Sequence, residues 1–296
     1  MSFVKQLALR AALTAAFLFS VFASTAIAAS PAMWHLSDKD SEIWLFGTIH
    51  LLPPDLKWRS RKFDAALNAA DTVYLEVDVT RWSTDDFPLY LRQIGTNANF
   101  VSLSSILGSA DTQRLIDAAT SVGIPPHTLD QFRPWAAFLA LSRSQYIAQG
   151  FAGHAGADSV ISDIASAAGK RLAYFETMEQ QVEIFASLSP RMEKALLVST
   201  LDEFEKASAH SGKMLETWMR GEEVGIDQFP EAQNDTEMAA FEDALLGKRN
   251  RAWVRQITRI MAGSGKTFIA VGAGHMPGKQ GLITLLRAKG FKVKQL

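Results

Sequence analysis

The stretch WLFGTIHLLPPD, residues 44–55, runs from an apolar segment into a histidine, His50, and then into two prolines. The stretch TFIAVGAGHMPG, residues 267–278, has the same design: an apolar run, a glycine, two residues, His275 and a proline. Short apolar runs rich in aromatic and β-branched residues are typical of buried strands. The repeated GxxH pattern therefore predicts that the two histidines follow two buried strands and share one site.

Further apolar runs extend this prediction to a whole sheet. The strands are expected at residues 42–47, 72–78, 171–176, 267–274 and, at the end of the chain, 291–296. They lack clean polar alternation, as expected for strands that are covered on both faces. Residues 55–70 show helical spacing between the first two strands, and a strand, helix, strand unit implies a parallel pair with a right-handed crossover. The predicted fold class is α/β with a mostly parallel sheet.

Long helical patterns separate the two halves of this predicted core. They cover residues from about 83 to 165 and from about 177 to 262, with glycine and proline marking the loops between helices. The expected organisation is one domain over residues 29–296. Its core is expected at 42–80, 170–176 and 265–296, split by the large helical insertion.

The first 28 residues resemble a secretory signal peptide. Lys5 and Arg10 precede an apolar run, and Ala26, Ile27 and Ala28 offer small residues for cleavage. The alternative is an uncleaved membrane anchor, because the run approaches the length of a short spanning helix. We expect cleavage, a periplasmic or secreted location, and no stable membrane span afterwards.

The overall composition excludes several classes of function. The formal net charge is −1, so the chain has no basic field to bind nucleic acid. Cysteine is absent, which excludes disulfides, thiolate nucleophiles and cysteine ligands for zinc or iron-sulfur clusters. A metal would have to be held by His, Asp, Glu, backbone or water.

Four chemically active side chains lie at the predicted strand ends: His50, Glu76, Glu176 and His275. Ligands of open parallel sheets bind outside the carboxyl ends of the strands, so these four are expected to converge. Imidazoles with carboxylates suit zinc, manganese, iron or cobalt and are a poor match to calcium. A single histidine after a strand is more often a capped or solvated turn residue, and Glu76 alone is more often a salt-bridged strand residue, but the repeated GxxH context of His50 and His275 favours a functional role for that pair.

Two glycines and one further histidine complete the candidate site. Gly47 and Gly272 are expected to allow a tight exit from each strand and a close approach of the backbone. His154, in the stretch GHAGAD, is held in reserve because its loop precedes a helix that could face the same cleft.

Several stretches together resemble the TraB/GumN family, which includes the Tiki-type proteins. They are WLFGTIHLLP, YLEVD, FETMEQQ and VGAGHMPGKQGLITLLRAKGF, in that order along nearly the whole mature chain. The resemblance implies a core related to the ChaN and erythromycin-esterase-like superfamily, with His50, His275 and Glu76 as the functional centre. For Tiki-type members it implies a metal-dependent peptidase that uses manganese or cobalt.

The stretches LLGKRN and FETMEQQ add candidates under the same resemblance. Arg249 and Asn250 would lie on a helix that reaches the site, where Arg249 would place a carboxylate or an oxyanion. The alternative for this pair is a helix cap or a surface ion pair. Glu176 would be a fourth metal ligand or the general base, and Gln180 would bind a substrate backbone or cap its helix.

The predicted function is an exported metal-dependent hydrolase. We expect a peptidase that uses a metal-activated water, with manganese, cobalt or zinc as the cofactor and a peptide or protein as the substrate. One alternative is a protein of the cell envelope that sequesters a peptide or haem without turnover. A second is a scaffold in envelope assembly, for which both GxxH histidines would be dispensable.

Overall fold

The structure is a computed structural model, which describes residues 30–78, 86–98, 101–204, 207–224 and 236–296. The predicted signal peptide, residues 1–28, lies outside the described residues, as do parts of the predicted helical insertion.

The described residues form one six-stranded sheet with the strand order β4-β3-β5-β2-β1-β6. The strands are β1 (Met33–Ser37), β2 (Ser41–Thr48), β3 (Thr72–Leu75), β4 (Arg171–Tyr174), β5 (Gly265–Gly272) and β6 (Lys294–Gln295). Four neighbouring strands, β2, β5, β3 and β4, are parallel, and β1 is antiparallel to both β2 and β6. The α/β fold class with a mostly parallel sheet is therefore confirmed.

The five predicted strands all overlap observed ones, but two details of the prediction were wrong. Residues 33–37 form β1, which the apolar pattern did not indicate. The strands β2 and β3 were expected to pair directly, whereas β5 lies between them and pairs with both. Ile269 is thus opposite Leu45 on one side and Tyr74 on the other, a long-range arrangement that no local pattern specifies.

The helices surround this sheet and extend well beyond it. They are α2 (Arg61–Ala69), α3 (Asp86–Gly95), α4 (Leu103–Leu107), α5 (Ser109–Ser121), α6 (Pro126–Leu129), α7 (Pro134–Ala148), α8 (Ala157–Ala167), α9 (Met178–Ala186), α10 (Pro190–Glu203), α11 (Ala207–Met219), α12 (Thr236–Glu242), α13 (Lys248–Met261) and α14 (Leu282–Ala288). Short 3-10 turns cover Gly153–Ala155 and Ala273–His275, and a π-helical turn, Asp243–Gly247, leads into α13.

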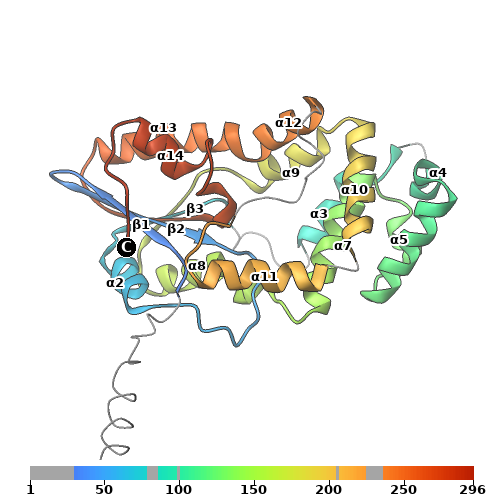
Figure 1. The fold of residues 1–296 in the computed structure, drawn as a ribbon, viewed down its shortest axis with the longest axis horizontal. Helices are drawn as coiled ribbons and strands as arrows, with labels where there is room; N and C mark the ends of the chain where they lie inside the picture. The colour runs from blue at the N-terminus through green and yellow to red at the C-terminus, as the bar shows by residue number, and fades with distance from the viewer. Residues whose placement is uncertain (1–29, 79–85, 99–100, 205–206, 225–235) are drawn as a thin grey trace, which may run out of the picture.

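Helices cover both faces of the sheet, as Figure 1 shows. On one face α13 and α14 pack with buried side chains such as Trp253 and Ile257 against Leu45. On the other face α2, α8 and α11 pack around Phe46 with Trp218 and others. Because both faces are covered, β2 is buried along nearly its whole length, which explains its continuous apolar sequence.

A second, all-helical region lies beside the sheet (Figure 1). It is built mainly from α3, α4, α5, α6, α7, α9 and α10, which share a core that includes Trp135, Leu141 and Leu197. Three helices within the ranges assigned to the insertion, α8, α11 and α13, cover the sheet instead. The sheet therefore receives its covering layers from segments far apart along the chain.

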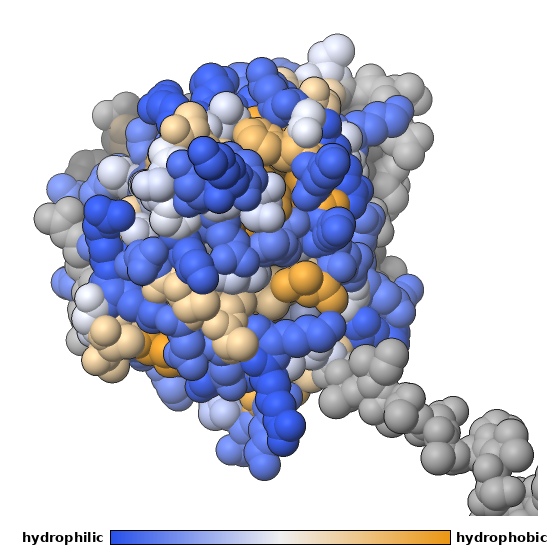
Figure 2. Space-filling view, turned by 90° about the vertical axis from the view of Figure 1, so that its left-hand side faces the viewer, coloured by the Kyte–Doolittle hydropathy of each residue, from blue (hydrophilic) through white to orange (hydrophobic). Residues whose placement is uncertain are grey.

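The face of the molecule in Figure 2 is mostly hydrophilic, with apolar side chains gathered in small separate patches. Among the helices that the structure describes, none combines the length and the apolar character needed to cross a membrane.

Candidate functional site at the carboxyl edge of the sheet

Four side chains follow the carboxyl ends of the parallel strands, as expected. Glu76 comes directly after β3, and His50 and Glu176 come two residues after β2 and β4, while His275 ends the 3-10 turn after β5. The backbones of the two glutamates are joined, because the Glu176 N–H donates to the Glu76 carbonyl oxygen at 3.0 Å. The strand ends thus bring two imidazoles and two carboxylates to one edge of the sheet.

Arg249, from the first turn of α13, lies at the centre of this group. Its Nη2 donates to Glu76 Oε2 at 2.7 Å and to Glu176 Oε1 at 2.5 Å, and its Nε donates to both Glu176 oxygens. Its Nη1 donates to His275 Nε2 at 2.9 Å. The guanidinium also lies over the Trp253 ring, at 4.8 Å from its centroid. Arg249 therefore ties both carboxylates and one imidazole into a single buried network.

The Glu76 carboxylate is buried and accepts three hydrogen bonds. Its Oε1 accepts from the Gly272 N–H at 2.5 Å, and its Oε2 accepts from Gln181 Nε2 at 2.8 Å as well as from Arg249. Burial acts to raise the pKa of Glu76, but His275, Arg249, His50 and the Gly272 N–H outweigh it and lower the pKa to about 2. At neutral pH, where His275 is uncharged, Arg249 still lowers the pKa of Glu76. Glu76 is therefore an ionised carboxylate in the interior.

His275 is buried, and its partners fix its tautomer. Because a guanidinium only donates, Nε2 accepts from Arg249 and Nδ1 carries the proton, which it donates to Asn250 Oδ1 at 2.6 Å. The ring lies 4.4 Å from the Trp253 ring, centroid to centroid. Burial lowers the pKa of His275 to about 4 against the attraction of Glu76. His275 is therefore neutral at neutral pH, with an imidazole lone pair directed into the cluster.

His50 differs from the other members because its side chain is 58% exposed. Its Nδ1 lies 3.0 Å from Asp158 Oδ1, in the first turn of α8. The attraction of Asp158, opposed by desolvation, raises the pKa of His50 to about 9. Water screens part of this attraction because the ring is more than half exposed. His50 is thus the accessible, protonatable edge of the cluster.

The two glycines act through close contact instead of an unusual backbone conformation. A Cβ on Gly272 would lie 3.0 Å from Glu76 Oε1 and 3.9 Å from His50 Nε2, so the missing side chain leaves room for the carboxylate. A Cβ on Gly47 would lie 3.0 Å from Ala273 Cα, so the two GxxH segments pack directly together. The approach of these segments places His50 and His275 around the same strand end.

Two predicted substrate-binding residues, Asn250 and Gln180, make hydrogen bonds within the protein. Asn250 was predicted to bind substrate, but it is 1% exposed and spends its amide on His275 and on the Gln280 carbonyl oxygen. Gln180 closes the capping box of α9 with Thr177, which was the alternative for that residue. Its neighbour Gln181 reaches Glu76.

Sequence reasoning missed Asp158 and Gln181. The stretch GHAGAD did draw attention to this loop, but through His154, which is exposed. Asp158 lies four residues further on and is the side chain of this segment that contacts the cluster. Gln181 lies in FETMEQQ, next to the residue that was selected. The sequence therefore indicates both stretches, but not the residue of each stretch that contacts the cluster.

A π-helical turn places Arg249. The turn Asp243–Gly247 directly precedes α13, and the Leu245 carbonyl oxygen within it accepts from Arg249 Nη1 at 2.8 Å. Single π turns are frequent at functional sites because they shift the angular phase of the helix that follows. Arg249 and Asn250 both reach His275, and Trp253, about one turn further along α13, packs on the sheet.

The donor set matches a divalent metal in chemistry. His275 Nε2 and Glu76 Oε1 are 3.7 Å apart, and each imidazole has a second partner on its other nitrogen, as is usual for metal-binding histidines. Among the described residues, however, no three His, Asp or Glu side chains stand close enough together to hold one ion. The His275 lone pair also accepts from Arg249. A metal would therefore have to displace Nη1 of Arg249.

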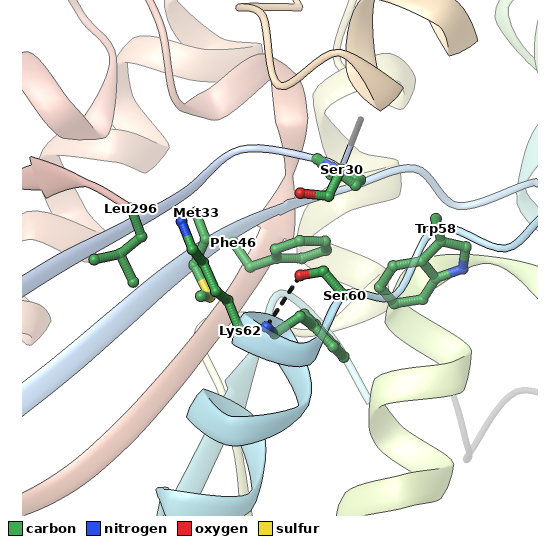
Figure 3. A pocket seen from close by; sticks show the side chains of 9 residues that line it. Ser30, Met33, Phe46, Trp58, Ser60, Lys62 and Leu296 are labelled. Carbon is green, nitrogen blue, oxygen red and sulfur yellow. Dashed lines mark hydrogen bonds between the residues drawn. The ribbon is translucent and has the colours of Figure 1, made fainter. Parts of the chain in front are cut away.

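Two small cavities lie away from the carboxylates. One, with a volume of about 10 Å³, has room for roughly one water molecule and is lined by Met33, Phe46, Trp58 and Ser60 among others (Figure 3). The other, of similar size, borders Gly47 and Trp218. Neither includes His50, Glu76, Glu176 or His275. Within the cluster, the His50 side chain is the most exposed of these four.

Fold and site together define an α/β protein with a buried carboxylate, imidazole and guanidinium cluster at the carboxyl edge of its sheet. The profile of the TraB/PrgY/gumN family matches residues 32–295, which is nearly the whole described chain. The chain belongs to this family. No curated protein and no solved structure matches it.

Proposed function

We propose that this protein is a hydrolase that cleaves amide or ester bonds, in the first place those of peptides, with a divalent metal held by His50, Glu76 and His275. The observation that carries the proposal is the convergence of these three residues. Glu76 Oε1 and His275 Nε2 are 3.7 Å apart, and both Glu76 Oε1 and His50 Nε2 lie within 4 Å of one point beside Gly272.

The charge balance of the site also favours a cation. Before a metal binds, three carboxylates, those of Glu76, Glu176 and Asp158, face one guanidinium and a charged His50, which would release its second proton in order to bind the metal. One negative charge is left over, and a buried negative charge is costly unless a cation or hydrogen bonds compensate it. A bound divalent cation would compensate it directly.

The metal would act as a Lewis acid for the substrate carbonyl and would favour deprotonation of the attacking water. Glu176 is the candidate base, because it lies at the same edge and its carboxylate is already held in place by Arg249. Arg249 is the candidate to stabilise negative charge that develops on the substrate oxygen. For these roles Arg249 has to release His275 Nε2 while it keeps its contacts with Glu176.

Manganese, cobalt and zinc all accept this mixture of imidazole and carboxylate donors. Isothermal titration of the full chain with each metal, followed by a peptide-library cleavage screen with the same metals, tests the proposal. We expect metal-dependent cleavage that His50→Ala and Glu76→Gln abolish. His127→Ala is the matched control, since His127 is exposed and lies in the helical region. Equal metal binding by the wild type and both site variants would disprove the site.

One observation supports a second candidate, a protein that sequesters a peptide or haem without turnover. With Arg249 in place, the His275 lone pair and both Glu176 oxygens are already occupied by hydrogen bonds. A site that stays in this arrangement could retain a ligand at His50 without activating water. Titration with peptides or haem would then give saturable binding, with the peptides recovered intact.

We also propose that the protein works outside the cytoplasm, in the periplasm or after secretion. The proposal rests on the sequence of residues 1–28, with two basic residues, an apolar run and a small-residue cleavage motif. N-terminal sequencing of the protein recovered from the periplasmic fraction should begin at Ala29. Recovery of the intact N-terminus from the membrane fraction would instead identify an anchor.

A further inference from the structure

The segment 152–158 holds the backbone of the first GxxH histidine. The N–H of Ala157 donates to the carbonyl oxygen of Ile49 at 2.9 Å. A Cβ on Gly156 would lie 2.1 Å from the His50 carbonyl oxygen, a distance that no real side chain tolerates. The segment therefore lies directly against the chain at His50, and glycine is required for that approach.

The same segment also holds the side chain of His50. Asp158 Oδ1 lies 3.0 Å from His50 Nδ1, and the Asp158 side chain is 11% exposed. A carboxylate only accepts, so Nδ1 carries a proton and the ring is held by that edge. The opposite nitrogen, Nε2, then faces the end of β5, where Glu76 Oε1 also lies next to Gly272.

We propose that Asp158 is a positioning residue, which fixes the Nδ1 proton and the orientation of His50 so that Nε2 faces Glu76 and His275. His50 needs such a partner more than the other members do. It is the exposed member of the cluster, and Asp158 is the described side chain that hydrogen-bonds to it. The inference deepens the proposed function, because an exposed ring with a free χ angle would be a poor ligand or base for a substrate.

The alternative role for Asp158 is to stabilise its helix. Asp158 lies in the first turn of α8, where a carboxylate interacts favourably with the helix dipole. That role predicts a loss of stability when Asp158 is replaced, and nothing more. The position of a proton on His50 and the affinity for a ligand at His50 are readouts that helix stabilisation alone would not change.

The first experiment observes the imidazole protons of the full chain labelled with ¹⁵N-histidine. Hydrogen-bonded Nδ1 protons exchange slowly with water and give resolved signals, which are expected for His50 and for His275. His50→Ala assigns the first signal. Asp158→Ala should remove this signal and leave that of His275, and Asp158→Asn should retain it in weakened form because the amide oxygen still accepts. Asp163→Ala, an exposed aspartate on the same helix, should leave both signals unchanged.

The second experiment titrates the same variants with Co²⁺ alone. Replacing the partner of a metal-binding histidine typically costs about 10–100-fold in affinity, so Asp158→Ala should weaken Co²⁺ binding by about that factor. Asp158→Asn should fall between it and the wild type, and Asp163→Ala should match the wild type. Asp158→Asn also provides the test if Asp158→Ala does not fold.

The outcomes separate this inference from the proposed function. A His50 signal that persists in Asp158→Ala overturns the positioning role. Wild-type Co²⁺ affinity in Asp158→Ala, when His50→Ala has lost it, overturns that role as well. If the wild type binds no Co²⁺, cobalt is excluded as the metal of the proposed function, which then depends on the titrations with manganese and zinc. The imidazole signals then decide the role of Asp158 by themselves.

Discussion

Arg249 is the group whose removal should disturb this site most. Its side chain is 12% exposed and its guanidinium holds two carboxylates that are 6% and 10% exposed, those of Glu76 and Glu176. Removing one partner of a buried ion pair leaves an uncompensated charge and costs about 3–5 kcal/mol. Arg249→Met keeps much of the side-chain volume and removes the charge. It should therefore lower the free energy of unfolding by about 3–5 kcal/mol.

The neighbouring arginine on α13 provides a matched control. Arg251 makes two contacts with Asp243 at 2.9 Å, but its side chain is 45% exposed. Exposed ion pairs contribute about 0–1 kcal/mol, so Arg251→Met should cost no more than that. Urea denaturation of the full chain at neutral pH, followed by tryptophan fluorescence, measures both variants. Equal losses of stability for Arg249→Met and Arg251→Met would refute the role of the buried cluster.

At acid pH, the free energies of unfolding of the wild type and Arg249→Met should differ less than at neutral pH. In the wild type the pKa of Glu76 is about 2 against 4.5 for an ordinary glutamate, so this carboxylate contributes stability above pH 4.5 that is lost as the pH falls toward 2. Without Arg249, burial raises the pKa of Glu76, and protonation relieves the uncompensated charge. A difference that stays constant between neutral and acid pH would mean that Arg249 acts through packing and not through its charge.

Three more changes test the surroundings of the cluster. The pKa of buried His275 is about 4 against 6.5 when unfolded, so the free energy of unfolding of the wild type should fall as the pH drops from 6.5 toward 4. His275→Gln should flatten this pH dependence, and His127→Gln should keep it. If the urea midpoints of His275→Gln depend on pH as those of the wild type do, the neutral buried ring is refuted. Gly272→Ala places a Cβ 3.0 Å from the Glu76 carboxylate and should cost about 1–3 kcal/mol in the same denaturation assay, whereas a neutral effect would show that the strand end is loose. Trp218→Phe deprives a buried strand carbonyl of its 2.8 Å partner and should cost about 1–3 kcal/mol by thermal melting, which a wild-type melting curve would contradict.

The strands that the sequence indicates well are those whose signal is local. Both β2 and β5 are eight residues long and are covered by helices on both faces, so their composition alone separates them from the rest of the chain. The five residues of β1, MWHLS, begin with Met33, end with Ser37 and include a histidine, and this composition fits a loop equally well. They form a strand because they pair with β2, and pairing with a distant partner leaves little trace in so short a segment.

The residues of the candidate site also differ in how well the sequence predicts them. The strand-end rule selects Glu76, Glu176 and the two histidines without knowledge of the strand order, because the carboxyl ends of parallel strands share one edge. It carries no information about helices that approach this edge from outside. Asp158 and Gln181 come from the first turns of α8 and α9, and which residue of a first turn faces the site depends on how each helix packs. Packing of that kind is a property of the whole fold.

The described cluster combines a closed part and an open part, and this difference decides how a ligand can enter. Glu76, Arg249 and His275 bond to one another and to neighbours such as Glu176 and Asn250, and they are almost inaccessible, so their geometry is set by the protein whatever the solvent contains. His50 is more than half exposed and depends on Asp158 for its orientation. A ligand from solvent therefore meets His50 first. It can reach the lone pair of His275 only when Nη1 of Arg249 withdraws, because one lone pair cannot serve both partners.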